Sequence, residues 1–223
     1  MYNSKKLNNC KSFYFMVYIY HMELIFIAIL GVVIFSIIIH EVAHGAAAYA
    51  LGDSTAKESG RLNFNPINHL DPMGSFLVPF VLLILNLPVI GWAKPVPVDF
   101  YSLKDKRWGA LKVSLAGPAS NLLVALIFSL LIRTSIFSAG FYQFFQIVIF
   151  YNIILAVFNL IPIPPLDGSH ILFDILGDKL SWLKDFLVQY GFFILLFFIF
   201  YGLDFVYNIS QKLFYLFTGL PLI

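Results

Sequence analysis

The chain has 223 residues, of which 60% are hydrophobic, only 12% are charged and 25 are phenylalanine. Soluble proteins are typically about 45–50% apolar and about 25% charged, so this composition excludes a water-soluble, disordered, collagen-like or disulfide-rich chain. The net charge is only +2, and the basic residues are scattered over loops, so no nucleic-acid partner is expected. The sequence therefore predicts the lipid bilayer as the main partner.

The N-terminal segment is short and starts with a polar stretch. Three lysines precede apolar residues 13–20, which resembles a signal peptide, but no small-residue cleavage site follows. Met22 directly precedes the first long apolar run. We therefore expect residues 1–21 to be a poorly ordered tail or the product of a misplaced start, and residues 22–223 to form a single domain.

Long apolar runs make up most of the remaining chain. A transmembrane helix needs about 20 apolar residues to cross the hydrocarbon core of a bilayer. No period of about 20–50 residues recurs, which argues against a repeat architecture. The predicted fold class is an all-α, polytopic membrane protein with about five apolar spans, at 24–50, 73–90, 111–132, 141–161 and 186–203.

The first span contains the sequence His40-Glu41-Val42-Ala43-His44. On a helix, two histidines four residues apart lie on one face and can bind one metal ion. Ionisable residues inside a span are costly, at about 2.5–3.5 kcal/mol for a central charge on insertion scales, and usually have a function. A metal site is the favoured interpretation, and an ordinary buried polar cluster is the alternative.

A hydrolytic zinc site usually has three protein ligands and one open position, so a third ligand is needed. Cys10 is the only cysteine, which leaves His21, His69, His170 and the carboxylates near membrane depth. Asp167 is the best candidate because it follows a proline-broken helix end, and irregular backbone at membrane depth is tolerated where it lines a cavity. A simple Asp-Gly turn is the alternative for Asp167.

The segment 94–99, Lys-Pro-Val-Pro-Val-Asp, is predicted to be extended. Alternate residues of a strand direct their N–H groups to opposite edges, so Pro95 and Pro97 remove donors from one edge only. The other edge keeps the N–H groups of Val96 and Val98, which could bind a substrate as a neighbouring strand. A proline-stiffened linker is the alternative, because X-Pro repeats favour polyproline geometry.

Three motifs follow one another in a recognisable order: HExxH at 40–44, Gly-Pro-Ala-Ser-Asn at 117–121, and Asn159 followed by Pro-x-x-Pro-Leu-Asp-Gly at 162–168. Over about residues 23–178 they resemble the site-2 protease family of intramembrane zinc metalloproteases. The loops between the first spans resemble a compact subgroup of that family without additional regulatory domains.

The resemblance implies a specific set of site residues. His40, His44 and Asp167 would bind one Zn²⁺ per chain, and Glu41 would be the catalytic base. Asn159 would face the active site and help to hold the substrate.

The predicted function is hydrolysis of peptide bonds within or near transmembrane segments, as in regulated intramembrane proteolysis. The substrate helix must unwind locally, because helical amides are hydrogen-bonded and shielded. A membrane metal-ion transporter is the alternative, because intramembrane histidines and carboxylates also mark ion paths, and an inactive scaffold of the same fold is the third interpretation. Neither the motifs nor the spans predict an oligomeric state.

Three further polar residues have two interpretations each. Asn121 lies inside a span and needs a partner there, so it either binds substrate or joins helices. His69 and Asp71 lie in a polar loop and either approach the metal region or serve as a turn and helix start before Pro72.

The relative direction of the spans gives a topological prediction. The metal ligands require the first and fourth runs to end at the same depth, and a full crossing by 73–90 would make those two runs antiparallel. Gly74, Pro79 and Pro88 also break the run at 73–90. We therefore predict a re-entrant hairpin or partial crossing there, in a multi-pass protein of the cell membrane. Basic residues in the flanking loops place these loops and the active site toward the cytoplasm.

Overall fold

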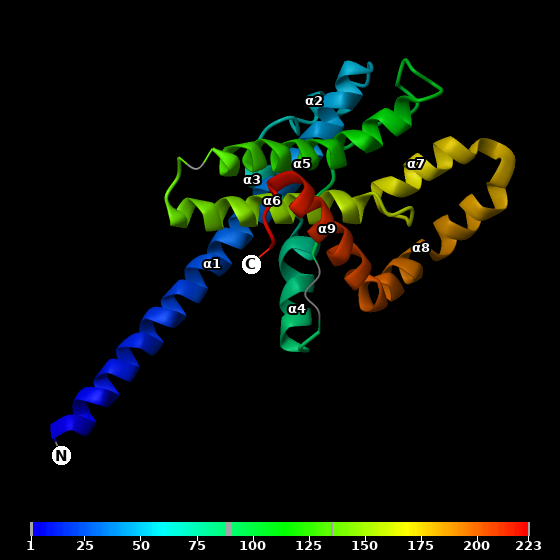
Figure 1. The fold of residues 1–223 in the computed structure, drawn as a ribbon. Helices are drawn as coiled ribbons and strands as arrows, with labels where there is room; N and C mark the ends of the chain where they lie inside the picture. The colour runs from blue at the N-terminus through cyan, green and yellow to red at the C-terminus, as the bar shows by residue number, and fades with distance from the viewer. Residues whose placement is uncertain (1, 88–90, 135, 223) are drawn as a thin grey trace.

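The computed structural model describes residues 2–87, 91–134 and 136–222, with most side chains from Glu23 onward. The described residues form helices and loops without strands, which confirms the predicted all-α fold (Figure 1). The helices are α1 (Tyr2–Ala50), α2 (Thr55–Glu58), α3 (Pro66–His69), α4 (Val78–Ile84), α5 (Gly109–Arg133), α6 (Ala139–Asn159), α7 (Asp167–Leu176), α8 (Ser181–Tyr201) and α9 (Leu203–Thr218).

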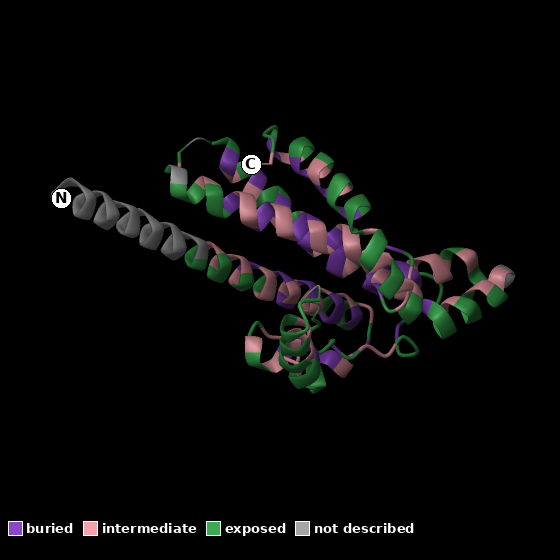
Figure 2. Ribbon diagram, turned by 90° about the horizontal axis from the view of Figure 1, so that it is seen from below, coloured by how far each residue is buried: buried purple, intermediate pink, exposed green. Residues whose placement is uncertain are grey.

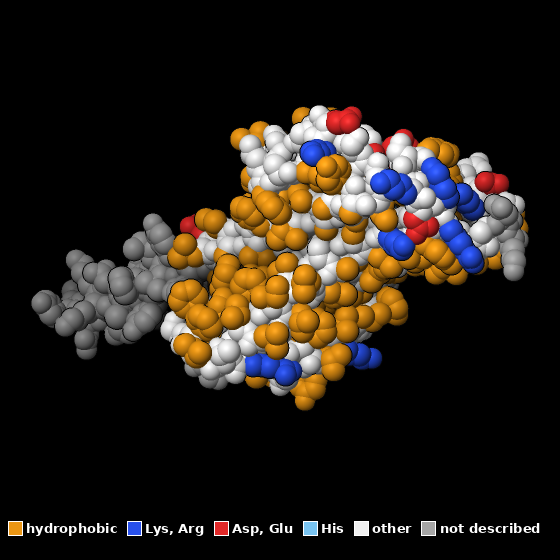
Figure 3. All heavy atoms as spheres, turned by 90° about the horizontal axis from the view of Figure 1, so that it is seen from above, with side chains coloured by type: hydrophobic (Ala, Val, Ile, Leu, Met, Phe, Trp, Pro, Cys, Tyr) orange, Lys and Arg blue, Asp and Glu red, His pale blue; other side chains and the backbone are white. Residues whose placement is uncertain are grey.

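Four helical stretches are long and apolar enough to cross a membrane: Glu23–Ala50, Gly109–Arg133, Gly140–Asn159 and Ser181–Tyr201. They coincide with four of the five predicted runs, and the chain is a multi-pass membrane protein. Figure 3 shows hydrophobic side chains over the middle of one face, whereas most Lys and Arg side chains on that face gather toward the end farthest from the N-terminus.

The structure continues α1 through residues 2–21, which the sequence predicted to be a tail. No proline or glycine occurs before Gly31, so no helix-breaking residue interrupts this segment. Figure 1 shows the N-terminal part of α1 projecting away from the other helices. The boundary at residue 22 stays a prediction.

The run at 73–90 does not form a continuous span. A π-helical turn, Pro72–Leu77, leads directly into α4, and the two end at Ile84. At about 1.5 Å per residue this helical piece is clearly shorter than an about 30 Å hydrocarbon core. A full crossing by this helix alone is therefore excluded.

The chain then returns to the start of the same segment. The N–H of Trp92 donates to the Gly74 carbonyl at 3.1 Å, and Ser75 Oγ donates to the Trp92 carbonyl at 3.0 Å. Residues 88–90 of the predicted run lie outside the described residues. Because the two described ends of the segment meet, the chain turns back on itself as predicted, and the re-entrant course within the membrane stays a prediction.

Helices α1, α5 and α6 pack against one another and hold the polar centre of the molecule. Figure 2 shows buried residues along α5, α6 and the C-terminal half of α1. One apolar cluster joins α5 and α6 to α9 and consists of Ala125, Ile132, Phe145, Ile149, Ile153 and Phe214.

The proline-rich segment after α6 sets the position of Asp167. Helix α6 ends at Asn159, and three prolines intervene before α7 begins at Asp167. A Cβ atom at Gly168 would lie only 2.3 Å from the Leu160 carbonyl oxygen. Glycine therefore allows the start of α7 to pack directly against the end of α6.

Candidate active site

The C-terminal half of α1 presents two buried histidines on one face. The exposed fractions are 6% for His40 and 9% for His44, and the two Nε2 atoms lie 3.0 Å apart. This arrangement follows from the helical repeat, which places residues i and i+4 one above the other.

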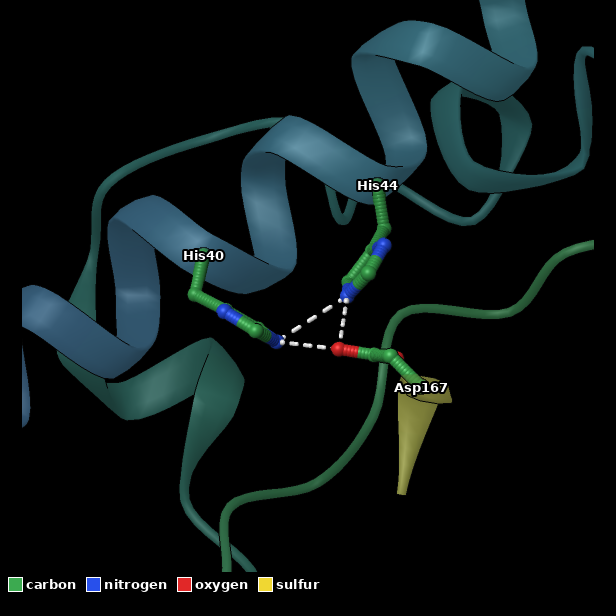
Figure 4. A group of neighbouring side chains, drawn as sticks. All are labelled: His40, His44 and Asp167. Carbon is green, nitrogen blue, oxygen red and sulfur yellow. Dashed lines mark hydrogen bonds and ion pairs between the residues drawn. The ribbon is translucent and has the colours of Figure 1, made fainter. Parts of the chain in front are cut away.

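Asp167, the first residue of α7, completes the group. Its Oδ2 atom lies 3.1 Å from His40 Nε2 and 3.3 Å from His44 Nε2 (Figure 4). Among the described residues, this is the group of His, Cys, Asp and Glu side chains that could hold a metal ion. The three side chains predicted to be ligands therefore come together from α1 and α7.

The other ring nitrogens determine how the two imidazoles are protonated. His44 Nδ1 lies 2.7 Å from the Val113 carbonyl oxygen, which can only accept, so this nitrogen is the N–H donor. His40 Nδ1 lies 2.7 Å from Asn121 Oδ1 and donates in the same way. In its neutral form, each ring with the proton on Nδ1 directs an unprotonated Nε2 lone pair at Asp167.

This donor set fits a metal cation. Two Nε2 lone pairs and a carboxylate oxygen converge, and the buried Asp167 Oδ2 accepts no hydrogen bond from the described residues. Three acceptors at such short range repel one another unless a cation lies between them. Two histidines and one carboxylate match the three protein side chains that a hydrolytic zinc site usually has.

Gly117 of α5 leaves the space that such an ion needs. A Cβ atom at this position would lie 2.3 Å from His44 Nε2 and 2.6 Å from His40 Nε2. These distances approach the about 2.0–2.1 Å of zinc–nitrogen bonds, so the missing methyl group corresponds to open volume beside both rings.

Glu41 lies next to the ligand group without joining it. Its half-buried carboxylate accepts a hydrogen bond from the Val96 N–H, with 2.8 Å between Oε2 and the backbone nitrogen. The bond spans 55 positions of sequence and holds the segment after the hairpin against α1.

The segment around Val96 differs from the predicted strand edge. Residues 91–99 form neither helix nor strand, and the N–H groups of Trp92, Lys94 and Val96 donate to Gly74, His69 and Glu41. The Val96 N–H, which was predicted to be open for a substrate strand, is therefore used by the protein itself. The reason is that the hairpin returns the chain directly alongside α1, which the sequence pattern did not indicate.

The two asparagines singled out in the sequence lie in different surroundings. Asn121 is fully buried, its Oδ1 faces His40, and its Nδ2 donates within the protein. Its side chain therefore has no exposed surface to offer a substrate. Asn159, the last residue of α6, is half-buried and donates to the Leu155 carbonyl at 2.9 Å.

The structure separates the remaining candidate ligands from the metal group. His69 is buried in the polar loop, where Nε2 donates to the Asn63 carbonyl at 2.8 Å. Asp71 accepts from the N–H groups of Met73 and Gly74 and begins the hairpin helix as a cap. His170 is exposed and stacks on Phe100, and His21 lies outside the described side chains.

Asp53 supports the site and was missed in the sequence, where it resembled an ordinary turn residue. It is 1% exposed and accepts hydrogen bonds from Thr55 and from the Asp99 N–H, the latter at 2.8 Å. Burial alone would raise the pKa of Asp53, but these hydrogen bonds hold the pKa below its ordinary value. An ionised Asp53 therefore fixes the chain three residues after Val96.

Arg61 fixes the same segment on the other side of Val96. Its guanidinium donates to the carbonyl oxygens of Asn68, Lys94 and Pro95. Together, Arg61 and Asp53 hold the Val96 N–H at Glu41. No local sequence signal could reveal this, because each contact joins separate loops.

Comparison with known proteins gives a consistent assignment. Residues 130–199 match the model of peptidase family M50. The chain is 42% identical over 172 residues to YwhC of Bacillus subtilis, which is named as a candidate zinc metalloprotease, and this alignment covers 73% of the chain and 75% of YwhC.

More distant relatives carry similar names. Rip2 of Mycolicibacterium smegmatis, also named as a candidate zinc metalloprotease, is 32% identical over 65% of the chain and 55% of Rip2. The zinc metalloprotease MJ0392 of Methanocaldococcus jannaschii is 32% identical over 40% of the chain and 27% of that protein. The chain thus spans about half of Rip2 and about a quarter of MJ0392. No solved structure matches the chain.

The match to YwhC covers about three quarters of both chains, and the family-model match contains Asn159 and Asp167. This chain therefore belongs to peptidase family M50, the site-2 protease family of membrane zinc metalloproteases.

Proposed function

We propose that this metalloprotease is an intramembrane zinc endopeptidase that hydrolyses peptide bonds within or near transmembrane segments, as in regulated intramembrane proteolysis. The observation that carries this proposal is the convergence of His40, His44 and Asp167, with Glu41 on the same helical turn of α1. One zinc ion per chain would be held by the three converging atoms, and the two histidines of the group lie on an apolar span.

A bound zinc ion would polarise the scissile carbonyl and lower the pKa of water to about 7. Glu41 would act as the general base and take the proton of the attacking water. The Val96 N–H occupies Oε2, which leaves Oε1 available for this proton. Glu41 would then return the proton to the departing amine, so one carboxylate serves both steps.

The proposed substrate is a membrane protein whose transmembrane helix is locally unwound. The segment carrying Val96 and Val98 lies directly against the base, so a substrate strand along it would bring its carbonyl groups toward the ligand group. Asn159 uses one amide hydrogen on Leu155, and its other hydrogen and Oδ1 can bond to a substrate backbone. We propose substrate-binding roles for Val98 and Asn159, with Val98 supplying the backbone N–H, because the N–H of Val96 is bonded to Glu41.

We also propose that the protein resides in the cell membrane with its active site toward the cytoplasm. The hairpin returns to its own starting point, so the loops before and after it share one side. Basic residues of these loops favour the cytoplasmic side, and they are Lys57, Arg61, Lys94, Lys104, Lys106 and Arg107.

Replacing Glu41 with glutamine tests the peptidase proposal. We expect Glu41→Gln to abolish cleavage of a transmembrane substrate reconstituted in vesicles, because an amide cannot take the proton of water. Zinc content should stay unchanged, because Glu41 lies outside the ligand group. Cleavage is measured by product electrophoresis, and zinc by elemental analysis of the purified protein.

Glu23→Gln is the matched control, because Glu23 is an exposed residue of the same span. This variant should retain full cleavage. Full cleavage by Glu41→Gln would contradict the proposal. Zinc flux into wild-type vesicles without cleavage would instead favour the metal-ion transporter.

A proline at Val96 tests the contact between the hairpin segment and the base. Val96→Pro removes the N–H that donates to the Glu41 carboxylate. Loss of this hydrogen bond costs about 1.5 kcal/mol or more, so we expect cleavage to fall at least about tenfold, with zinc content unchanged. Val96→Ala keeps the N–H and should retain most of the activity. Equal activities of the two variants would make the segment a mere linker.

A further inference from the structure

A ladder of buried amides connects the metal group to α6. Asn121 Oδ1 accepts from His40 Nδ1 at 2.7 Å, and Asn121 Nδ2 donates to Asn152 Oδ1 at 2.9 Å. Asn152 Nδ2 in turn donates to the Val148 carbonyl at 2.9 Å and to Ser36 Oγ at 2.8 Å. The ladder therefore crosses from α1 through α5 to α6.

Two backbone carbonyls fix the direction of this ladder. The Val148 oxygen can only accept, so Asn152 must direct its NH₂ group there and its Oδ1 at Asn121. The Ser36 carbonyl also accepts from Asn121 Nδ2, at 3.1 Å. With its NH₂ group engaged twice, Asn121 can only present its oxygen to His40.

The orientation of Asn121 matters because it selects the tautomer of His40. A flipped Asn121 would present its NH₂ group to Nδ1, which would then have to accept, and the ring proton would move to Nε2. A protonated Nε2 cannot bind a metal ion. His44 has no such alternative, because its partner is the Val113 carbonyl of the main chain, which cannot rotate.

The surroundings leave no substitute for these bonds. Asn121 and Asn152 are both 0% exposed and Ser36 is 3% exposed, in the part of the bundle where three helices pack together. Water therefore cannot replace a lost partner, and the donor-to-acceptor direction of these hydrogen bonds depends on the residues of the ladder themselves.

We propose that Asn152 is a positioning residue for the metal site, acting through Asn121 to keep the lone pair of His40 Nε2 directed at the ion. This inference rests on the zinc site of the proposed function. It extends that site by a residue that contacts neither metal nor substrate.

The test measures zinc affinity by chelator competition on the purified full-length chain. Asn152→Leu removes one of the two acceptors of Asn121 Nδ2 and leaves only the Ser36 carbonyl to orient this amide. We expect zinc affinity to fall about 10–100-fold, the usual effect of losing a partner that orients a metal-binding histidine. In Asn152→Asp, burial favours the neutral carboxylic acid, which keeps an acceptor for Asn121 and an O–H donor for the Val148 carbonyl. This variant should keep zinc affinity within about threefold of wild type, well short of that loss. Ser129→Ala removes another fully buried polar group of α5, outside the ladder, and should leave zinc affinity unchanged.

Making the same substitution in an Asn121→Asp protein distinguishes a positioning role of Asn152 from a role in stabilising the fold. In Asn121→Asp, either carboxylate oxygen can accept from His40, so the orientation of this side chain no longer needs Asn152. Adding Asn152→Leu to this background should change zinc affinity less than about threefold, against the about 10–100-fold expected in wild type. An equal loss in both backgrounds, or a loss in Asn152→Asp as large as in Asn152→Leu, would overturn the proposal.

The readout is zinc binding and not cleavage. If the protein binds zinc but cleaves no transmembrane substrate, the peptidase proposal fails while the positioning role of Asn152 stands or falls by its own result.

Discussion

Replacing Gly117 with alanine is expected to abolish zinc binding and, with it, all proteolytic activity. The new methyl carbon would lie 2.3 Å from His44 Nε2 and 2.6 Å from His40 Nε2, in the volume that the ion must occupy. Helix α5 cannot easily withdraw, because Val113 and Asn121 hold the two rings from either side of Gly117 on the same helix. Elemental analysis of purified protein should therefore find almost no zinc.

Gly31→Ala provides the control for this substitution. Gly31 also lies in an apolar span, and a Cβ atom there would meet no other group within 4 Å. This variant should retain zinc and activity. Alanine is about 1 kcal/mol more favourable than glycine inside a helix, so the substitution should not destabilise α1. Normal zinc content in Gly117→Ala would mean that the ion does not lie between the two histidines and Gly117.

Replacing Asp167 with asparagine should have a comparable effect through charge. Asparagine has nearly the same shape, but it removes the carboxylate that faces His40 and His44. Its NH₂ group would donate to the two Nε2 lone pairs and satisfy them without a metal ion. We expect zinc affinity to fall by more than the about 100-fold that loss of a ligand's hydrogen-bond partner can cost.

Chelator competition on the purified variant measures this affinity directly. Asp105→Asn is the control, because Asp105 lies in the loop before α5, pairs with the solvent-accessible Lys112 and should not influence zinc. If Asp167→Asn bound zinc as tightly as wild type, Asp167 would be removed from the ligand set, and His170, three residues later, would become the candidate to test next.

Features that depend on neighbouring positions along the chain could be predicted from the sequence. The spacing of His40 and His44 implies a shared helical face, and the structure places their Nε2 atoms 3.0 Å apart. The length and apolarity of four runs determined the spans, and the helix breakers in the run at 73–90 pointed to the hairpin. Asp167 needed the family resemblance as well, because an Asp-Gly pair by itself also forms simple turns.

Features that depend on how the helices pack were decided only by the tertiary structure. The hairpin carries Val96 back to Glu41 across 55 positions, and helix packing brings Asn152 to Asn121 across 31. Only the packing of α5 against α1 places Gly117 beside the rings of both His40 and His44. Hydropathy and spacing constrain each helix separately, whereas these contacts depend on the rotation and depth of one helix relative to another. The rotation and depth of each helix are determined by the complete set of buried hydrogen bonds and apolar contacts, which no single segment contains.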